Sequence, residues 1–148
     1  MAGFLDGDGS LMLQIKNRKD GKTKIRFMST ICFYQDSRHE ENLYWIRKIL
    51  GIGYISRRND GMTELRINGF KQVKDILGLL LPYLKFKIIQ GKALLKATEI
   101  LMKAPLKKLN KKQLSKLVDY ILEIQNENYV TKSKKTKEDL FIILGLTP

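Results

Sequence analysis

Residues 1–10 read MAGFLDGDGS, and in this stretch very small residues stand close to acidic ones. Ala2, Gly3 and Gly7 have almost no side chain, and small residues spaced by four allow two helix backbones to approach closely, as in pairs of membrane helices. A close approach of two copies would bring their Asp8 carboxylates together. Clustered carboxylates repel one another unless divalent cations lie between them, and hard oxygen ligands with open positions suit Mg²⁺. The stretch is therefore compatible with a helix-pairing surface at Ala2, Gly3 and Gly7 and with Mg²⁺ held between the carboxylates of two paired helices.

Three other interpretations of this stretch stay open. A calcium-binding loop that begins at Asp6 needs glycine at its sixth position and glutamate at its twelfth, where the chain has Leu11 and Asn17. A phosphatase of the haloacid-dehalogenase type also has two Asp residues spaced by two after an apolar strand. Against it, no later acidic motif supplies metal ligands, and strands do not alternate with helices as in a parallel sheet. The third interpretation is an exposed acidic turn without a function.

The charge of the chain favours a polyanionic partner. Among 148 residues, 28 Lys and Arg outnumber 15 Asp and Glu, which leaves a formal net charge of +13 at pH 7. Nucleic acid is the first candidate and an anionic membrane the second. Insertion into a membrane is not expected, because the longest apolar stretches, near 76–81 and 141–146, fall far short of the ~20 residues that a spanning helix needs.

The cysteine content favours a reducing compartment. Cys32 is the only cysteine, so an internal disulfide is excluded, and the chain does not start with a charged-then-apolar signal segment. We therefore expect an intracellular protein, from a prokaryotic cytoplasm or an organelle, that is not secreted.

Alternating apolar and polar residues predict two β-hairpins. Strands are expected over residues 10–18 and about 24–34, joined by an Asp-Gly turn at 20–21, and over 54–58 and 62–68. Polar residues of these strands occupy even positions and therefore share one sheet face. Arg can bind guanine, and Gln or Asn can bind adenine, in the major groove. We predict a DNA-binding face made of Gln14, Lys16, Arg18, Lys24, Arg26, Met28, Ser56, Arg58, Glu64, Arg66 and Asn68; the alternative is a merely solvated face.

Helical periodicity covers much of the remaining sequence. Helices are expected at about 38–50, 70–81, 87–103, 110–125 and 138–144, with a polar stretch at 131–137 before the last one. Capping boxes are predicted at Ser37 with Glu40, and at Asn110 with Gln113. Trp45 is expected in the core. The chain as a whole, 1–148, is expected to form a single α+β domain, with its core at about 1–103 and a C-terminal helical extension at about 104–148.

The first ten residues closely resemble the LAGLIDADG motif of homing endonucleases. They differ from it at Met1 and by conservative changes at Phe4, Leu5 and Gly7. In relatives several helical residues precede the motif, so a truly short helix here would leave less apolar area for a dimer interface.

The resemblance extends beyond the motif. The order of motif helix, hairpin, helix, hairpin and helix over about 1–103 is similar to the αββαββα core of that family, which has a saddle-shaped antiparallel sheet. The segments GIGY at 51–54 and LPYLKFK at 81–87 resemble segments of its single-motif, homodimeric subgroup. The resemblance thus implies an intron-encoded homing endonuclease that acts as a homodimer.

The resemblance also implies roles for particular residues. The second acidic residue of the motif binds the metal, which implies that Asp8 is catalytic and binds Mg²⁺ and that Gly7 offers its backbone carbonyl. Lys87 corresponds to a basic residue near the scissile phosphate. Gln35 and His39 correspond to residues that hold active-site water, although relatives carry Arg in place of His39. The plainer interpretations are a solvated lysine, a polar strand-end residue and an exposed residue of a first helical turn.

The implied reaction is metal-dependent hydrolysis that leaves a staggered double-strand break with 3′ overhangs. One chain has one motif, so the catalytic unit must be a two-fold dimer and its target near-palindromic. A nine-residue strand spans ~30 Å, or about nine base pairs, so two chains would cover roughly 20 base pairs of double-stranded DNA. The alternative function is an intron maturase, or a DNA- or RNA-binding protein with little or no cleavage.

Overall fold

The computed structural model describes residues 1–20, 24–128 and 134–146. Its elements follow the order α1 (Ala2–Asp8), β1 (Gly9–Asn17), β2 (Ile25–Asp36), α2 (Glu41–Leu50), β3 (Tyr54–Arg57), β4 (Met62–Asn68), α3 (Phe70–Leu80), α4 (Ile88–Lys103), α5 (Lys111–Glu127) and α6 (Lys137–Leu144). Short 3₁₀ helices at Ser37–His39, Leu81–Tyr83 and Leu106–Lys108 join some of them. The turn predicted at 20–21 and the polar stretch predicted at 131–137 lie partly outside the described residues.

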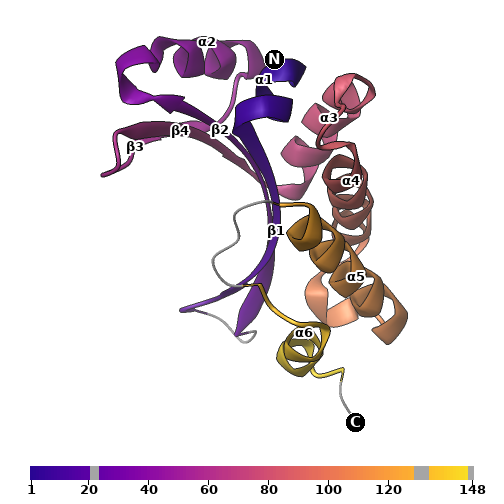
Figure 1. The fold of residues 1–148 in the computed structure, drawn as a ribbon. Helices are drawn as coiled ribbons and strands as arrows, with labels where there is room; N and C mark the ends of the chain where they lie inside the picture. Colours follow the sequence, from indigo (N-terminus) through magenta and orange to yellow (C-terminus); the bar gives the residue numbers. More distant parts are fainter. Residues whose placement is uncertain (21–23, 129–133, 147–148) are drawn as a thin grey trace.

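The strands form one antiparallel sheet in the order β1-β2-β4-β3. Ser10 lies opposite Cys32, Cys32 opposite Arg66, and Arg66 opposite Tyr54. Residues that lie opposite each other in a ladder share a face, so this register carries the even positions of all strands on one face. The sheet curves strongly, and α3, α4 and α5 run along one side of it (Figure 1).

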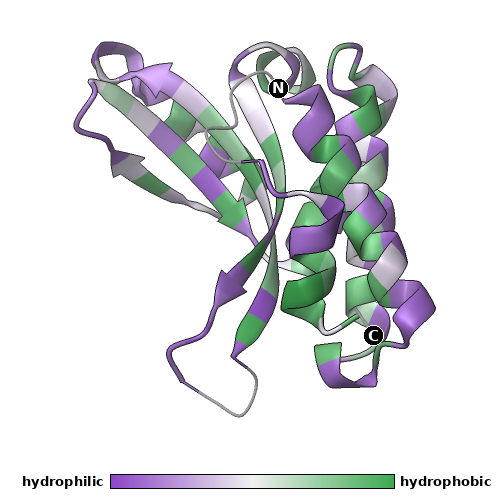
Figure 2. Ribbon diagram, turned by 60° about the horizontal axis from the view of Figure 1, so that its bottom comes forward, coloured by the Kyte–Doolittle hydropathy of each residue, from purple (hydrophilic) through white to green (hydrophobic). Residues whose placement is uncertain are grey.

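The core lies between the sheet and these helices. Odd-numbered strand residues such as Leu11, Phe33 and Leu65 are fully buried and pack with helix residues such as Leu77 and Leu94. Each such side chain contributes about 1.5–3 kcal/mol when it leaves water. Apolar and polar residues alternate along the strands, as Figure 2 shows by hydropathy. The α+β class and the predicted order of helices and hairpins are confirmed.

Pro82 lies between α3 and α4, in the interval between the helices predicted at 70–81 and 87–103. It stands in a 3₁₀ helix, Leu81–Tyr83, that directly follows α3. Proline lacks the N–H that an α-helix interior requires, so the helix ends and the chain can redirect before α4. Among the helices of the described residues, none has the length and apolar character that crossing a membrane requires.

The capping box predicted at Ser37 and Glu40 is wrong. Ser37 Oγ hydrogen-bonds Thr63 Oγ1 at 2.8 Å, and α2 begins only at Glu41 without a side-chain cap. The Glu40 carboxylate accepts hydrogen bonds from Arg57 and Thr63 instead. A charged guanidinium from β3 is a stronger partner than a backbone N–H, and local sequence spacing does not reveal it.

The second predicted capping box is confirmed. Asn110 Oδ1 accepts from the backbone N–H of Gln113 at 2.8 Å, and Gln113 Oε1 accepts from the backbone N–H of Asn110 at 3.0 Å. Both partners lie within one helical turn, which explains why local spacing was sufficient here.

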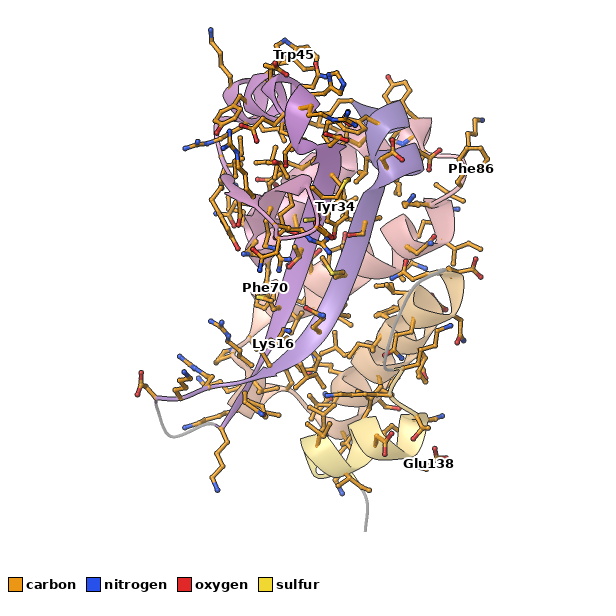
Figure 3. The ribbon with its side chains drawn as sticks, turned by 60° about the vertical axis from the view of Figure 1, so that its left-hand side comes forward. Lys16, Tyr34, Trp45, Phe70, Phe86 and Glu138 are labelled. Carbon is orange, nitrogen blue, oxygen red and sulfur yellow. The ribbon has the colours of Figure 1, made fainter. Side chains whose placement is uncertain are left out.

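The expectation that Trp45 lies in the core is also wrong. Its relative exposure is 57%, and the side chain lies on the outer side of α2 (Figure 3). The buried residues of α2 are Leu43 and Ile46. Trp45 comes between them in sequence, and a helical step of about 100° per residue turns it away from their stripe.

Candidate active site and nucleic-acid interface

Asp8 lies at the junction where α1 ends and β1 begins. The next residue, Gly9, must be glycine, because a Cβ there would stand 2.7 Å from the Leu5 backbone oxygen and 2.9 Å from its Cα. The tight junction fixes the direction of Asp8 relative to the sheet. Asp8 is exposed, and its carboxylate has no hydrogen-bond or ion-pair partner among the described residues. It is therefore free to bind a cation or a water molecule.

Gln35 lies beside Asp8. Both residues line one cavity of about 260 Å³, together with side chains of α1 and α2 that include Asn42 and Trp45. Gln35 Oε1 accepts the backbone N–H of Asp36 at 2.9 Å, which orients its amide. His39 lies in the 3₁₀ helix after β2, is exposed, and is not among the residues that line this cavity.

Lys87 approaches the same helix end from the other side. It precedes α4, and its Nζ donates to the backbone oxygen of Asp6 at 2.5 Å and to that of Gly7 at 3.3 Å. The structure therefore brings Lys87 next to Gly7 and brings Gln35 next to Asp8. Gly7 and Asp8 form the C-terminal end of α1, and Lys87 and Gln35 lie next to it.

Asp6 is a site residue that the sequence reasoning missed. Its carboxylate is buried and accepts the backbone N–H groups of Lys85 at 2.8 Å, Phe86 at 3.0 Å and Lys87 at 2.8 Å. Burial acts to raise the pKa of Asp6, but these N–H groups and the charge of Lys87 outweigh it and leave the pKa lowered. The partners are some 80 positions away in the sequence, so no local pattern could indicate them.

The even-numbered face of the sheet carries the residues predicted to contact DNA. The ladders pair Gln14 with Met28 and Lys16 with Arg26, and the backbone N–H of Arg18 donates to the carbonyl of Lys24 just beyond the strands. The second hairpin supplies the same face with Ser56, Arg58, Glu64, Arg66 and Asn68. The positions thus share a face, and their contacts with DNA remain predictions.

Polar pairs already organise the middle of this face. Glu64 is buried and forms an ion pair with Arg66 at 3.2 Å, so its carboxylate is engaged within the protein. Thr30 Oγ1 donates to Asn68 Oδ1 at 2.7 Å. Arg58 lies over the ring of Tyr34. Such contacts restrict the side-chain rotamers before any ligand arrives, which lowers the entropy cost of binding.

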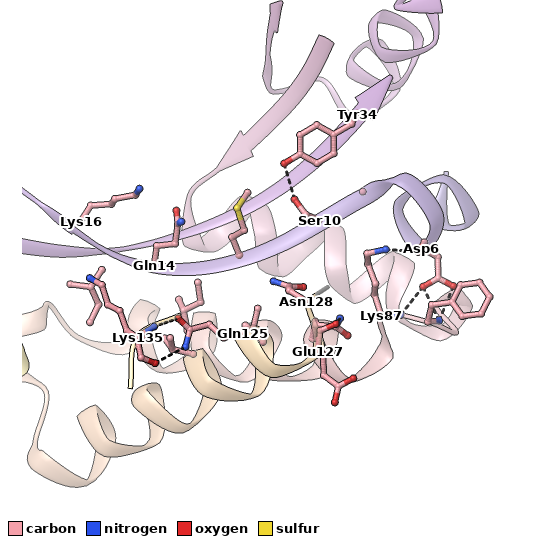
Figure 4. A pocket seen from close by; sticks show the side chains of 18 of the residues that line it. Asp6, Ser10, Gln14, Lys16, Tyr34, Lys87, Gln125, Glu127, Asn128 and Lys135 are labelled. Atoms are coloured by element: carbon pink, nitrogen blue, oxygen red, sulfur yellow. Dashed lines mark hydrogen bonds between the residues drawn. The ribbon is translucent and has the colours of Figure 1, made fainter. Parts of the chain in front are cut away.

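A groove of about 950 Å³ runs along the outer edge of β1. One wall carries Gln14 and Lys16 of the strand, and the other carries Gln125 at the end of α5 (Figure 4). The amide of Gln125 exchanges two hydrogen bonds with the backbone of Lys135. Lys87 lies at one end of the groove, so the cationic sheet face continues to the C-terminal end of α1.

The donor set suits a hard divalent cation. An exposed carboxylate, a backbone carbonyl and a side-chain amide are oxygen donors, which Mg²⁺ prefers while it retains several waters. Over the described residues, His, Cys, Asp and Glu side chains form no group of three or more that could hold a metal. Among the described residues, the oxygen donors at this place are therefore those of Asp8, Gly7 and Gln35.

Comparisons with known proteins give the family. The family model of the LAGLIDADG endonucleases matches residues 1–96. The DNA endonuclease I-CvuI of Chlorella vulgaris is 35% identical over 135 residues, which cover 91% of this chain and 80% of that protein. The DNA endonuclease I-CreI of Chlamydomonas reinhardtii is 31% identical over 107 residues, which cover 70% of this chain and 63% of that protein.

Solved structures agree with the sequence comparisons. The crystal structure of I-CvuI in complex with its target, in the presence of calcium, matches with a TM-score of 0.79 and 30% identity over 97% of this chain and 91% of that one. An archaeal intron-encoded homing endonuclease, I-Vdi141I, complexed with DNA, matches with a TM-score of 0.81 over 98% of this chain and 92% of that one. At 20% identity, the second match shows the fold alone.

A curved antiparallel sheet with a cationic polar face, and a free carboxylate and a lysine at the same helix end, are features of a nucleic-acid-cleaving enzyme. The extent of the family match and the identity to I-CvuI then make the assignment specific: the chain belongs to the LAGLIDADG endonuclease family. It is a site-specific homing endonuclease that acts on DNA.

Proposed function

We propose that this endonuclease works as a homodimer in which each chain contributes one Asp8 to Mg²⁺-dependent hydrolysis of a phosphodiester. The observation that carries the proposal is the free, exposed Asp8 carboxylate at the end of a helix of small residues. The other acidic side chain of this helix, Asp6, is buried and bound to the N–H groups of residues 85–87, so a second Asp8 is the natural complement.

The helix face supports this arrangement. Gly3 and Gly7 are exposed, and a Cβ added at either one would meet no atom within 4 Å. The face is therefore open in the isolated chain and smooth enough for a second helix backbone to approach it, with Ala2 beside it. Two such helices, related by a two-fold axis, would place the two Asp8 carboxylates side by side.

Each residue around the helix end has a proposed role. Asp8 and the Gly7 carbonyl would hold Mg²⁺, which when bound would polarise the scissile phosphate. Lys87 would neutralise charge that develops on the phosphate in the transition state. Gln35 would orient the attacking water through its amide, while His39, exposed and outside the cavity of Asp8, would contact water only from the rim.

The sheet face is proposed to read the target. Its strands would follow the major groove, and Arg66 and Gln14 would contact base edges while Lys16 and Arg26 contact phosphates. Glu64, which is paired with Arg66, would act mainly by holding that guanidinium in place. Two chains would cover a near-palindromic site of roughly 20 base pairs and leave a staggered break with 3′ overhangs.

The cell compartment is part of the proposal. Cys32 is the only cysteine of the chain and is buried as a free thiol, which agrees with a reducing setting such as a prokaryotic cytoplasm or an organelle.

The decisive experiment is Mg²⁺-dependent cleavage of a random double-stranded DNA library with sequencing of the cut ends. The wild type is compared with Asp8→Asn and with Asp119→Asn, which removes the same charge from an exposed position on α5. We expect one near-palindromic site, cut equally by wild type and Asp119→Asn and at least ~10³-fold more slowly by Asp8→Asn, because metal stabilisation is worth several kcal/mol.

Two outcomes would contradict the proposed function. If the wild type binds DNA or structured RNA without cutting, and Asp8→Asn binds as well, then the chain is a binding protein or maturase. Cleavage that survives Asp8→Asn would remove Asp8 from the chemistry.

A further inference from the structure

The C-terminal end of α1 holds a cation that belongs to the protein itself. The helix stops at Asp8, and strand β1 follows at once, so the last carbonyl groups of the helix lack helical partners. Two of them, the Asp6 and Gly7 oxygens, accept hydrogen bonds from the ammonium of Lys87. The ammonium also complements the negative end of the helix.

Both the backbone and the side chain of Lys87 hold it in this position. Its backbone N–H is one of the three that the buried Asp6 carboxylate binds at the start of α4. Its side chain then returns to the carbonyl groups of the helix that carries Asp6, as Figure 4 shows. The lysine is half-buried, whereas Lys85, two residues earlier, is exposed and its ammonium has no partner among the described residues. The rotamer of Lys87 is therefore fixed before DNA arrives.

The ammonium of Lys87 lies where the proposed metal would have to bind. It lies 3.3 Å from the Gly7 carbonyl, one of the oxygens proposed as a ligand, and Asp8 is the next residue. A divalent cation on the same oxygen would stand within a few ångströms of a positive charge. Two like charges at that range repel each other even at the dielectric constant of water, and they repel more strongly when they are partly buried.

We infer that in the DNA-free protein Lys87 takes the place of the divalent cation at the Gly7 carbonyl, so that metal binds tightly only together with DNA. A phosphate oxygen is charged and so attracts an ammonium more strongly than a neutral carbonyl does. When the phosphodiester arrives, Lys87 moves to it and the Gly7 carbonyl becomes free for metal. This inference rests on the proposed metal-dependent function and adds an order of loading to it.

The test measures Mn²⁺ binding to the DNA-free protein, with unbound Mn²⁺ followed by electron paramagnetic resonance. We expect Lys87→Met to bind Mn²⁺ at least ~10-fold more tightly than the wild type, from the repulsion given above. Lys85→Met removes the same charge two residues away and should bind as weakly as the wild type. Lys87→Arg keeps the charge and should also bind weakly, and Asp8→Asn combined with Lys87→Met should lose the gain.

Two results would overturn the inference. In the first, Lys87→Met folds, as a circular dichroism melt shows, and yet binds Mn²⁺ no more tightly than Lys85→Met. In the second, Lys87→Arg binds Mn²⁺ as tightly as Lys87→Met, which would exclude charge as the cause. The Lys87→Arg variant also provides a test if methionine at this position disturbs the fold. Either result leaves the proposed function intact as long as the wild type cuts DNA and Asp8→Asn does not.

Discussion

Gly3 allows a test in which the isolated chain and the dimer respond in opposite directions. Gly3 in α1 and Gly78 in α3 are both helical and exposed, and a Cβ at either meets no atom within 4 Å. Leucine at either position should therefore be tolerated within one chain. Replacing a helical glycine gains up to about 1 kcal/mol, less near a helix end as at Gly3, which corresponds to a melting temperature higher by roughly 2–4 °C.

The dimer should distinguish the two substitutions. If two α1 helices pack closely, a two-fold interface receives the Gly3→Leu side chain twice. Overpacking costs about 1–3 kcal/mol per site, so two sites cost about 2–6 kcal/mol and weaken dimerisation by roughly 30-fold to 10⁴-fold. Sedimentation velocity over a concentration series would give the dissociation constants of wild type, Gly3→Leu and Gly78→Leu, and DNA cleavage should be lost with the dimer.

Two results would refute the proposed interface or the dimer itself. An unchanged dissociation constant for Gly3→Leu, with a melting temperature raised as in Gly78→Leu, would mean that the glycine face of α1 is not the dimer interface. A wild type that remains monomeric with and without DNA would refute the dimer itself.

Two further predictions concern buried and paired carboxylates. Asp6→Asn should lower the melting temperature by roughly 6–12 °C at neutral pH, because it weakens the binding of the N–H groups of residues 85–87 at a cost of about 3 kcal/mol. Glu40, beside Arg57 and Thr63, has its pKa lowered from 4.5 to about 2 by their hydrogen bonds. A lowered folded-state pKa means that its stabilisation is complete above about pH 4.5 and is lost as the pH falls toward 2. Thermal melts of wild type and Glu40→Gln should therefore differ at pH 7 and converge near pH 2; a difference that persists at low pH contradicts this assignment.

The sequence predicted features that depend on interactions between nearby residues, and it missed features that depend on residues far apart in the chain. Strand alternation depends on side chains two residues apart, so the polar sheet face could be predicted before the register was known. The cap at Asn110 likewise has its partner within one turn. Glu40 failed as a capping residue because its real partners come from β3 and β4, and Asp6 was missed because the N–H groups that it binds lie some 80 positions away.

The exposure of helix side chains was the other property that the sequence predicted poorly. Leu43, Ile46 and Ile49 recur at helical spacing in the helix predicted at 38–50, yet the first two are buried and Ile49 is 55% exposed. Trp45 is exposed as well, and it lines the cavity that contains Asp8. Periodicity shows which residues share a helix face; it does not show how much of that face the rest of the chain covers.

In the proposed dimer, α1 would connect the interface, the metal site and the sheet, so that their geometry would be fixed together. Its glycine face and Asp8 lie within seven helical residues, and Gly9 joins them to β1 without room for a Cβ. The separation of two Asp8 carboxylates would therefore be set by how closely the helices approach, and the direction of the sheets by the same junction. A substitution that widens the helix pair would thus move the metal ligands apart and shift the two DNA-reading faces relative to each other, so that cleavage and target spacing must change together.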